Sequence, residues 1–308
     1  MADSQWAIIR HRLSARHNMR VTLLGTGAMA CLFGARLAAV AEVTLLGSWA
    51  EGIAALQERG IVLEEASGAS TVRVHADRLS ADSTRGDSDL VLVLVKAWQT
   101  EHVAGYLQFS NAIILTLQNG LGNLDWLGPR AHLGVTTQGA TLLGPGRVRP
   151  GGAGLTHIAA PAWVAELLQS AGFETHGVGA EQVDGLLWGK LVVNCGINAL
   201  TALLRVPNGE LLARPEAAVV MERAALECAA VAQAKNIPLP FANPVDRVRE
   251  VAERTAINKS SMFQDILRGA PTEIDAINGA VVREGKRLGV PSPVNEMLWH
   301  LVRALAVT

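Results

Sequence analysis

The chain has 308 residues, of which 49% are hydrophobic and 18% are charged, and its net charge is −1. This length allows two domains that each have their own core, and the composition is that of an ordinary globular protein. The balanced charge gives no indication of a nucleic-acid partner or of a membrane surface bound by charge, and we find no apolar stretch long enough to span a bilayer.

Residues 1–18 differ from the sequence that follows them. They have neither the apolar h-region nor the small-residue cleavage site of a secretory signal, which excludes a signal peptide. A weakly amphipathic, transit-like leader remains an alternative. We interpret the segment as a disordered, basic N-terminal extension upstream of Met19, where the patterned sequence begins. Its basic and histidine residues are Arg10, His11, Arg12, Arg16 and His17.

Between residues 19 and 180, short β-branched runs alternate with segments of helical length. Leu90–Val95 is continuously apolar, as expected for a strand that is buried on both faces of a parallel sheet. Residues 144–154 are rich in Gly and Pro and predict turns between later, antiparallel strands. The alternation predicts a doubly wound α/β sheet. The predicted strands are Val21–Leu24, Val43–Leu46, Leu90–Val95, Ala112–Leu117 and Leu155–Ala159, and the predicted helices are Met29–Val40, Ala50–Arg59 and Gln99–Leu107.

After about Ala180 the strand signals end and only helical patterns follow. Asn243-Pro244 has the residues typical of a helix cap and first position, and Gly289-Val290-Pro291 those typical of a helix end. We therefore predict an all-helical domain over residues 181–308. Its predicted helices span residues 181–204, 209–235, 244–257, 260–268, 273–288 and 293–306.

A glycine-rich turn follows the first predicted strand. Val21–Leu24 leads into Gly25-Thr26-Gly27-Ala28-Met29-Ala30 and then into a helix, which is the position of a dinucleotide-binding G-x-G-x-x-G/A turn. Gly25 permits the tight turn, Gly27 allows the backbone to approach a pyrophosphate at the helix N-terminus, and Ala30 replaces the third glycine. The alternative is a strand–helix turn with no ligand. We predict a Rossmann-type nucleotide-binding domain.

The end of the second predicted strand indicates which nicotinamide cofactor binds. An NAD enzyme usually has an Asp or Glu there, which binds the ribose hydroxyls. Here Val43–Leu46 continues into Gly47-Ser48-Trp49, and Glu51 comes only in the next helix. NADP is therefore favoured, with Ser48 as a ligand for the 2′-phosphate, although no Arg stands at this place.

Three polar residues, Lys190, Asn194 and Asn198, recur at intervals of four in the apolar run 186–198. On a helix this spacing puts all three on one face. An ammonium and two carboxamides among Leu, Val and Ile are costly unless they bond to something, so the stripe predicts either a ligand site or a helix at a domain interface. Lys96 and Asn119 each follow a predicted strand, at the edge where such sheets bind ligands. Each alone is typical of a solvated lysine or of a turn.

Taken together, these motifs closely resemble the ketopantoate reductase (2-dehydropantoate 2-reductase) family. The likeness runs in order from about Met19 to the end of the chain. The motifs that carry it are the 25–30 turn, Lys96-Ala97-Trp98-Gln99, Gln118-Asn119-Gly120, Trp188-Gly189-Lys190-Leu191 with Asn194 and Asn198, Pro207-Asn208-Gly209-Glu210-Leu211, Ser260-Ser261-Met262-Phe263-Gln264-Asp265 and Thr272-Glu273-Ile274-Asp275.

The resemblance implies NADPH-dependent reduction of 2-dehydropantoate to (R)-pantoate, in pantothenate and coenzyme A biosynthesis. Lys190 matches the family's proton donor. The substrate-binding residues are implied to be Lys190, Asn194, Asn198, Asn208, Ser260 and Ser261, and the cofactor-binding residues Gly25, Thr26, Gly27, Ala28, Met29, Ala30, Lys96, Asn119, Ala140 and Glu273. One departure concerns Ser48, because family members that use NADP often have an Arg there.

Two alternatives remain open at this point: an NAD(P)-dependent reductase of another branched 2-oxo acid, and a non-catalytic NADP-sensing protein. The three cysteines, Cys31, Cys195 and Cys228, are widely spaced, so neither a disulfide framework nor a metal site is expected. They indicate a reduced compartment, and we expect a cytoplasmic protein with a small 2-oxo acid as partner. A homodimer is compatible with the sequence.

Overall fold

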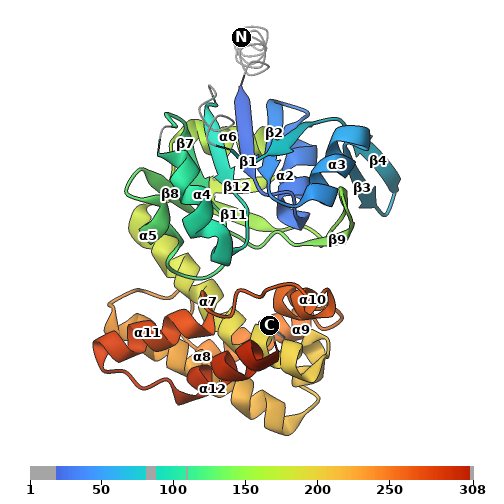
Figure 1. Cartoon of the computed structure of the whole chain (residues 1–308). Coiled ribbons are helices and arrows are strands. Elements are labelled where there is room, and N and C mark those ends of the chain that lie inside the picture. Colours follow the sequence, from blue (N-terminus) through green and yellow to red (C-terminus); the bar gives the residue numbers. More distant parts are fainter. Residues whose placement is uncertain (1–18, 81–87, 109, 306–308) are drawn as a thin grey trace, which may run out of the picture. The chain divides into compact units, whose positions relative to one another are not determined.

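The computed structural model describes residues 19–80, 88–108 and 110–305 (Figure 1). The extension predicted for residues 1–18 therefore lies outside the described residues. By its internal contacts the chain divides into two compact units. The second unit contains Gly179 and all described residues after it, together with two short segments, Lys96–Trp98 and Asn119–Gly122; the rest of the described chain forms the first unit.

A doubly wound sheet forms the centre of the first unit. Its eight described strands are ordered β12-β11-β8-β7-β6-β1-β2-β5, and neighbouring strands are parallel except for β11 and β8. This Rossmann-type arrangement confirms the predicted fold class. The strands are β1 (Arg20–Leu24), β2 (Glu42–Gly47), β5 (His75–Arg78), β6 (Leu90–Val93), β7 (Ile113–Thr116), β8 (Ala131–Thr136), β11 (Leu155–Ile158) and β12 (Glu174–Gly177).

The central strands form because both of their faces are buried. All four residues of β6 and four of the five in β1 are buried, and continuous burial of this kind requires an apolar residue at successive positions. β6 ends at Val93, two residues before the end of the predicted run. The helices of this unit are α2 (Ala28–Leu37), α3 (Ala50–Arg59), α4 (Thr100–Leu107), α5 (Asn123–Leu127) and α6 (Ala162–Ser170). A 3₁₀ turn, η1 (Ala97–Gln99), precedes α4, and its first two residues belong to the second unit.

A second, smaller sheet was not predicted. It has the strand order β4-β3-β10-β9 and consists of β3 (Ile61–Glu65), β4 (Gly68–Val72), β9 (Ala140–Gly144) and β10 (Arg147–Pro150). The prediction of turns between antiparallel strands in residues 144–154 is confirmed in part, because a turn at residues 145–146 joins the antiparallel strands β9 and β10; it missed that β10 itself lies within this stretch. Its Val148 is fully buried, and one anchoring side chain in a four-residue strand is too little to produce a recognisable alternation.

The second unit is helical. It consists of α7 (Ala180–Leu204), η2 (Asn208–Leu211), α8 (Pro215–Ala234), α9 (Pro244–Arg254), α10 (Ser261–Leu267), α11 (Asn278–Leu288) and α12 (Pro293–Leu305). The single helix predicted for residues 209–235 is wrong, since Arg214 is extended and Pro215 starts a new helix. The cap predicted at Asn243 is confirmed, because its Oδ1 accepts hydrogen bonds from the N–H groups of Val245 and Asp246. α11 starts at Asn278, five residues later than predicted.

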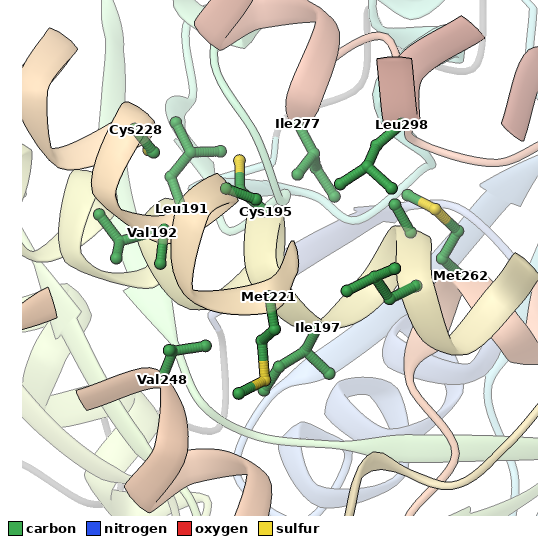
Figure 2. Close-up of a cluster of buried hydrophobic side chains, with 14 of the residues drawn as sticks. Leu191, Val192, Cys195, Ile197, Met221, Cys228, Val248, Met262, Ile277 and Leu298 are labelled. Carbon is green, nitrogen blue, oxygen red and sulfur yellow. The ribbon is translucent and has the colours of Figure 1, made fainter. Parts of the chain in front are cut away.

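α7 is the central helix of this unit. Figure 2 shows its buried side chains, among them Leu191, Cys195 and Ile197, beside Met221 from α8 and Val248 from α9. Contrary to our expectation from the sequence, α7 is long and apolar enough to cross a membrane by length and composition alone. However, 72% of its most apolar stretch is buried inside the protein, so its hydrophobicity is explained by its place in the core.

Candidate active site

α7 carries the three polar residues of the predicted stripe. Asn198 is 6% exposed, whereas Lys190 and Asn194 are half-buried. The neighbouring residues Leu191 and Cys195 are fully buried in the core (Figure 2). A helical period therefore separates an apolar face from a polar one on the same helix, and the structure places all three predicted residues on the polar face.

The ammonium of Lys190 is destabilised by its surroundings. Burial lowers the pKa of Lys190 from its ordinary 10.5 to about 8, and the nearby Glu273 carboxylate opposes this by raising it. Desolvation disfavours the charged form of an amine, while an opposite charge favours it. The result is a lysine that is mostly protonated at neutral pH and can still give up its proton readily.

Glu273 connects the two short segments Lys96–Trp98 and Asn119–Gly122 to the helical unit. Its side chain is 5% exposed. Its Oε1 accepts a hydrogen bond from the N–H of Ala97 at 3.0 Å, and its Oε2 accepts one from Asn119 Nδ2 at 3.0 Å. Lys96 Nζ lies 3.7 Å from the same Oε2. These donors fix the direction of the carboxylate.

The short turn around Asn119 follows from its glycine. Gly120 has φ +79°, and a Cβ built on it would lie 2.4 Å from the carbonyl oxygen of Ala276. The N–H of Leu121 donates to that oxygen at 2.9 Å. Only glycine combines the left-handed backbone with this close approach, which places Asn119 against the segment that contains Glu273.

Asp265 is a site residue whose role the sequence did not indicate. Its side chain is 2% exposed and lies 2.7 Å from Lys96 Nζ and 2.7 Å from Arg268 Nη2. A buried carboxylate requires such partners. The only local signal was the Asp–Arg pair with a spacing of three residues, which is also typical of a solvated helix surface.

The two serines before and at the start of α10 have different environments. Ser260 caps the helix, since its Oγ accepts the N–H of Phe263 at 3.1 Å, and it lies 2.7 Å from the hydroxyl oxygen of Thr201 on α7. Thr201 had not been predicted as a neighbour of the site. Ser261 is the first residue of α10 and is half-buried. The hydroxyl of Ser260 thus has structural partners, and Ser261 is the serine better suited to a ligand.

Asn208 lies in η2 and is 7% exposed. Its Nδ2 donates to Thr255 Oγ1 at 2.8 Å, and its backbone N–H donates to the carbonyl of Asn258 at 3.0 Å. Among the described residues its buried Oδ1 has no hydrogen-bond partner. A buried acceptor without a partner is costly in a native core, so it marks a place where a ligand donor is expected.

The glycine turn lies in the first unit, between β1 and α2. Gly25 has φ +129°, and a Cβ there would meet the backbone of Leu94 at 3.2 Å. Gly27 precedes α2 without a side-chain cap, and a Cβ on Gly27 would meet no atom within 4 Å. The start of α2 thus has no side-chain cap from Gly27 and has open space beside Gly27, as the approach of a pyrophosphate requires. The residues present fit a dinucleotide.

Other predicted cofactor residues also lie in the first unit. Thr26 and Ala30 are buried within the turn and the first part of α2. Ala140 is the first residue of β9, which packs against α2. Ser48 follows β2 and is exposed. Within the described part of the chain, no group of three or more His, Cys, Asp or Glu side chains could hold a metal.

Comparison with known proteins decides the family. The model of the ketopantoate reductase PanE/ApbA family matches residues 21–163, and that of its C-terminal domain matches residues 182–306. The chain belongs to the ketopantoate reductase family. The 2-dehydropantoate 2-reductase of Halobacterium salinarum is 39% identical over 302 residues, which cover 92% of this chain and 98% of that protein.

Solved structures show the same fold. The ketopantoate reductase from Ralstonia eutropha JMP134 superimposes with a TM-score of 0.84 at 34% identity, over 94% of this chain and 98% of that one. A ternary structure of D-mandelate dehydrogenase with NADH and anilino(oxo)acetate gives a TM-score of 0.86 at 27% identity, over 94% and 98% of the two chains. Proteins of this fold therefore include one that holds NADH.

Proposed function

We propose that this protein reduces the C2 carbonyl of 2-dehydropantoate to (R)-pantoate, with NADPH as the hydride donor. The observation that carries the proposal is the half-buried Lys190, whose pKa burial lowers to about 8 against the opposing charge of Glu273. Lysines with such values are matched to proton transfer near neutral pH. Family membership supplies the reaction class, and the relatives named above carry the activity in their names.

Lys190 is the proton donor in this scheme. When bound, NADPH would supply a hydride to C2, which would leave the developing negative charge on the carbonyl oxygen. The Lys190 ammonium stabilises that charge and transfers its proton to the oxygen, which yields the hydroxyl of pantoate. A positioned acid of this kind contributes roughly 10²–10⁴ in rate. Glu273 favours the charged form of Lys190 before the transfer.

The polar groups around Lys190 hold the substrate. Asn194 and Asn198 share its helix face, and Ser261 provides a hydroxyl at the start of α10. The buried Oδ1 of Asn208, which has no partner among the described residues, accepts a hydrogen bond from the terminal hydroxyl of 2-dehydropantoate. These contacts orient C2 for hydride transfer, and orientation is a large part of catalysis in bimolecular reactions.

The glycine turn binds the pyrophosphate of the cofactor. The open space over Gly27 and the uncapped start of α2 support this assignment. NADPH is favoured over NADH because β2 ends at Gly47 and continues into Ser48 and Trp49 without a carboxylate that would repel a 2′-phosphate. Pantoate is a precursor of pantothenate and coenzyme A, so we place the enzyme in that biosynthetic route and in the cytoplasm.

A second candidate is the reduction of another 2-oxo acid with NADH. It is favoured by the high structural similarity to the D-mandelate dehydrogenase that was solved with NADH and anilino(oxo)acetate. The two candidates share the role of Lys190 and differ in the substrate side chain and in the cofactor. The reaction class therefore holds under both.

The decisive experiment is NADPH oxidation by the purified protein with 2-dehydropantoate, repeated with NADH and with a panel of branched and aromatic 2-oxo acids. We expect the highest kcat/KM for NADPH with 2-dehydropantoate. Lys190→Ala should lose kcat by about 10²-fold or more while it binds NADPH normally. Lys286→Ala, which removes an exposed lysine from α11, is the matched control. Normal turnover of Lys190→Ala would remove Lys190 from the mechanism, and a higher kcat/KM for an aromatic 2-oxo acid would replace the proposed substrate.

A further inference from the structure

The end of β2 lacks the cation that the 2′-phosphate of NADPH usually meets. This inference rests on the proposed use of NADPH. In nucleotide-binding folds of this kind an Arg close to the end of the second strand accommodates that phosphate. Here Gly47-Ser48-Trp49-Ala50 contains no basic residue, and Ser48 is exposed and neutral. A neighbouring element must therefore provide the positive charge if the protein selects NADPH.

The next strand of the sheet supplies a candidate at this position. β5 is the edge strand beside β2 and runs parallel to it, with Gly47 paired to Arg78. The N–H of Leu79 donates to the carbonyl of Gly47 at 2.9 Å, so the pairing continues to the last residue of both strands. Arg78 thus ends β5 directly beside the point where β2 gives way to Ser48, and it is exposed.

The direction of the Arg78 side chain follows from its partner. A Cβ built on Gly47 would lie 2.8 Å from Cγ2 and 2.9 Å from Oγ1 of Thr26, so this face of the strand is turned toward the glycine turn. Paired residues of adjacent parallel strands project to the same face of the sheet. The Cβ of Arg78 is therefore on the glycine-turn side, and alternation puts Asp77 on the opposite side.

α3 begins directly after Ser48 and Trp49, so its first turn also belongs to the region that follows β2. Trp49 precedes this helix without a side-chain cap, so the first N–H groups of α3 have no side-chain partner from that residue. Glu51, in the first turn, is exposed and is the acidic residue of that turn. A guanidinium from Arg78 would offset its charge and provide a fork of donors that matches phosphate oxygens.

We propose that Arg78 binds the 2′-phosphate of NADPH, with Ser48 as its neutral partner, and thereby supplies the positive charge that the end of β2 lacks. NADPH selectivity in this chain then depends on the third strand of the sheet, counted from β1 through β2 to β5, and not on the second. The register with Gly47 fixes the backbone position of Arg78 at this end of the sheet.

Equilibrium binding to the full-length protein tests this assignment without catalysis. Dissociation constants are measured by calorimetry for NADPH, NADH, 2′,5′-ADP and 5′-AMP, with the wild type, Arg78→Ala, Arg78→Lys and Arg59→Ala. Arg59 ends α3 and is an exposed arginine of the same unit, so it controls for loss of net charge. We expect Arg78→Ala to weaken NADPH and 2′,5′-ADP by about tenfold or more while NADH and 5′-AMP stay unchanged. Arg78→Lys should retain part of the preference.

These binding constants distinguish a failure of the Arg78 assignment from a failure of the proposed reaction. If the wild type prefers NADPH and Arg78→Ala keeps that preference, Arg78 does not contact the phosphate and the proposed reaction is untouched. An equal loss for all four ligands would also overturn the assignment, because it would indicate damage to the fold. If the wild type binds NADH as tightly as NADPH, both the role of Arg78 and the NADPH preference fail, while reduction of 2-dehydropantoate with NADH would still be measurable.

Discussion

The ammonium of Lys96 lies 2.7 Å from Oδ2 of Asp265, a side chain that is only 2% exposed, although 169 residues separate the two in the chain. Asp265 also contacts Arg268, and Lys96 also approaches Glu273. Ion pairs therefore hold Lys96, which lies shortly after β6, against carboxylates of the helical unit. Because Glu273 raises the pKa of Lys190, this cluster also supports the residue that we propose as the proton donor.

Breaking the Lys96–Asp265 pair should destabilise the protein. Lys96→Met leaves a buried carboxylate with Arg268 as its remaining cation, and we expect a loss of about 1–3 kcal/mol in the free energy of unfolding. Urea unfolding of Lys96→Met, Asp265→Asn and the double variant measures the coupling between the two side chains. Lys286→Met breaks an exposed pair with Glu296 and should cost at most about 1 kcal/mol. Strict additivity of the Lys96 and Asp265 variants would contradict the pairing.

The pH dependence of turnover should report Lys190. Its pKa is lowered to about 8, so the ammonium proposed as the proton donor is present below that pH and is lost above it. We expect kcat/KM to fall as pH rises through about 8, well below the 10.5 of an ordinary lysine. Glu273 raises the pKa of Lys190, so Glu273→Gln should move this fall to lower pH. A profile that stays flat up to pH 10 would contradict the assignment.

Removing the charge of Lys190 should stabilise the fold while it abolishes activity. The folded-state pKa of about 8 lies below the ordinary 10.5, so between these values the unfolded chain binds more protons and stability rises with pH. At pH 7 the destabilisation is fully present. Lys190→Met should therefore raise the free energy of unfolding at pH 7 by on the order of 1–3 kcal/mol, and by less at pH 10. Thermal unfolding at both values measures this, and a loss of stability at pH 7 would refute it.

Ser260 and Ser261 should have different roles, the first in stability and the second in substrate binding. Ser260→Ala removes a helix cap and the contact with Thr201, and we expect it to cost about 1–2 kcal/mol of stability. Ser261→Ala should leave the free energy of unfolding nearly unchanged and raise the KM for the 2-oxo acid. The pair is tested by urea unfolding and steady-state kinetics on both variants. Equal effects on KM would mean that the two hydroxyls are not divided in this way.

Gly120→Ala should damage the site through the backbone. The residue has φ +79°, and a new Cβ would lie 2.4 Å from the carbonyl oxygen of Ala276. We expect the Asn119–Glu273 hydrogen bond to be displaced, with a loss of about 1–3 kcal/mol in stability and a fall in kcat. Gly128→Ala is the matched control, because Gly128 has φ +80° but no atom within 4 Å of the added Cβ. Similar losses in both variants would show that the contact with Ala276 is unimportant.

Local patterns in the sequence were sufficient for the fold class and the family. The apolar runs of β1 and β6, the glycine turn after β1 and the Lys–Asn–Asn stripe of α7 each depend on residues that are close together in the chain. A strand that is buried on both faces has a continuous apolar run, and a helix that is buried on one face has apolar residues with a helical period. By contrast, β10 and the later start of α11 were missed, because elements whose bounds depend on contacts with distant residues show no recognisable apolar pattern of their own.

The chain's local patterns were thus enough to predict the Rossmann-type sheet, the glycine turn and the polar face of α7. Three relationships became visible only in the folded chain: the ion pair of Asp265 with Lys96, the capping of α10 by Ser260, and the register of Arg78 with Gly47. The tertiary structure also decided the acidity of Lys190. The reason is physical: a charge is tuned by burial and by neighbouring charges, and both depend on which distant segments the folded chain brings together.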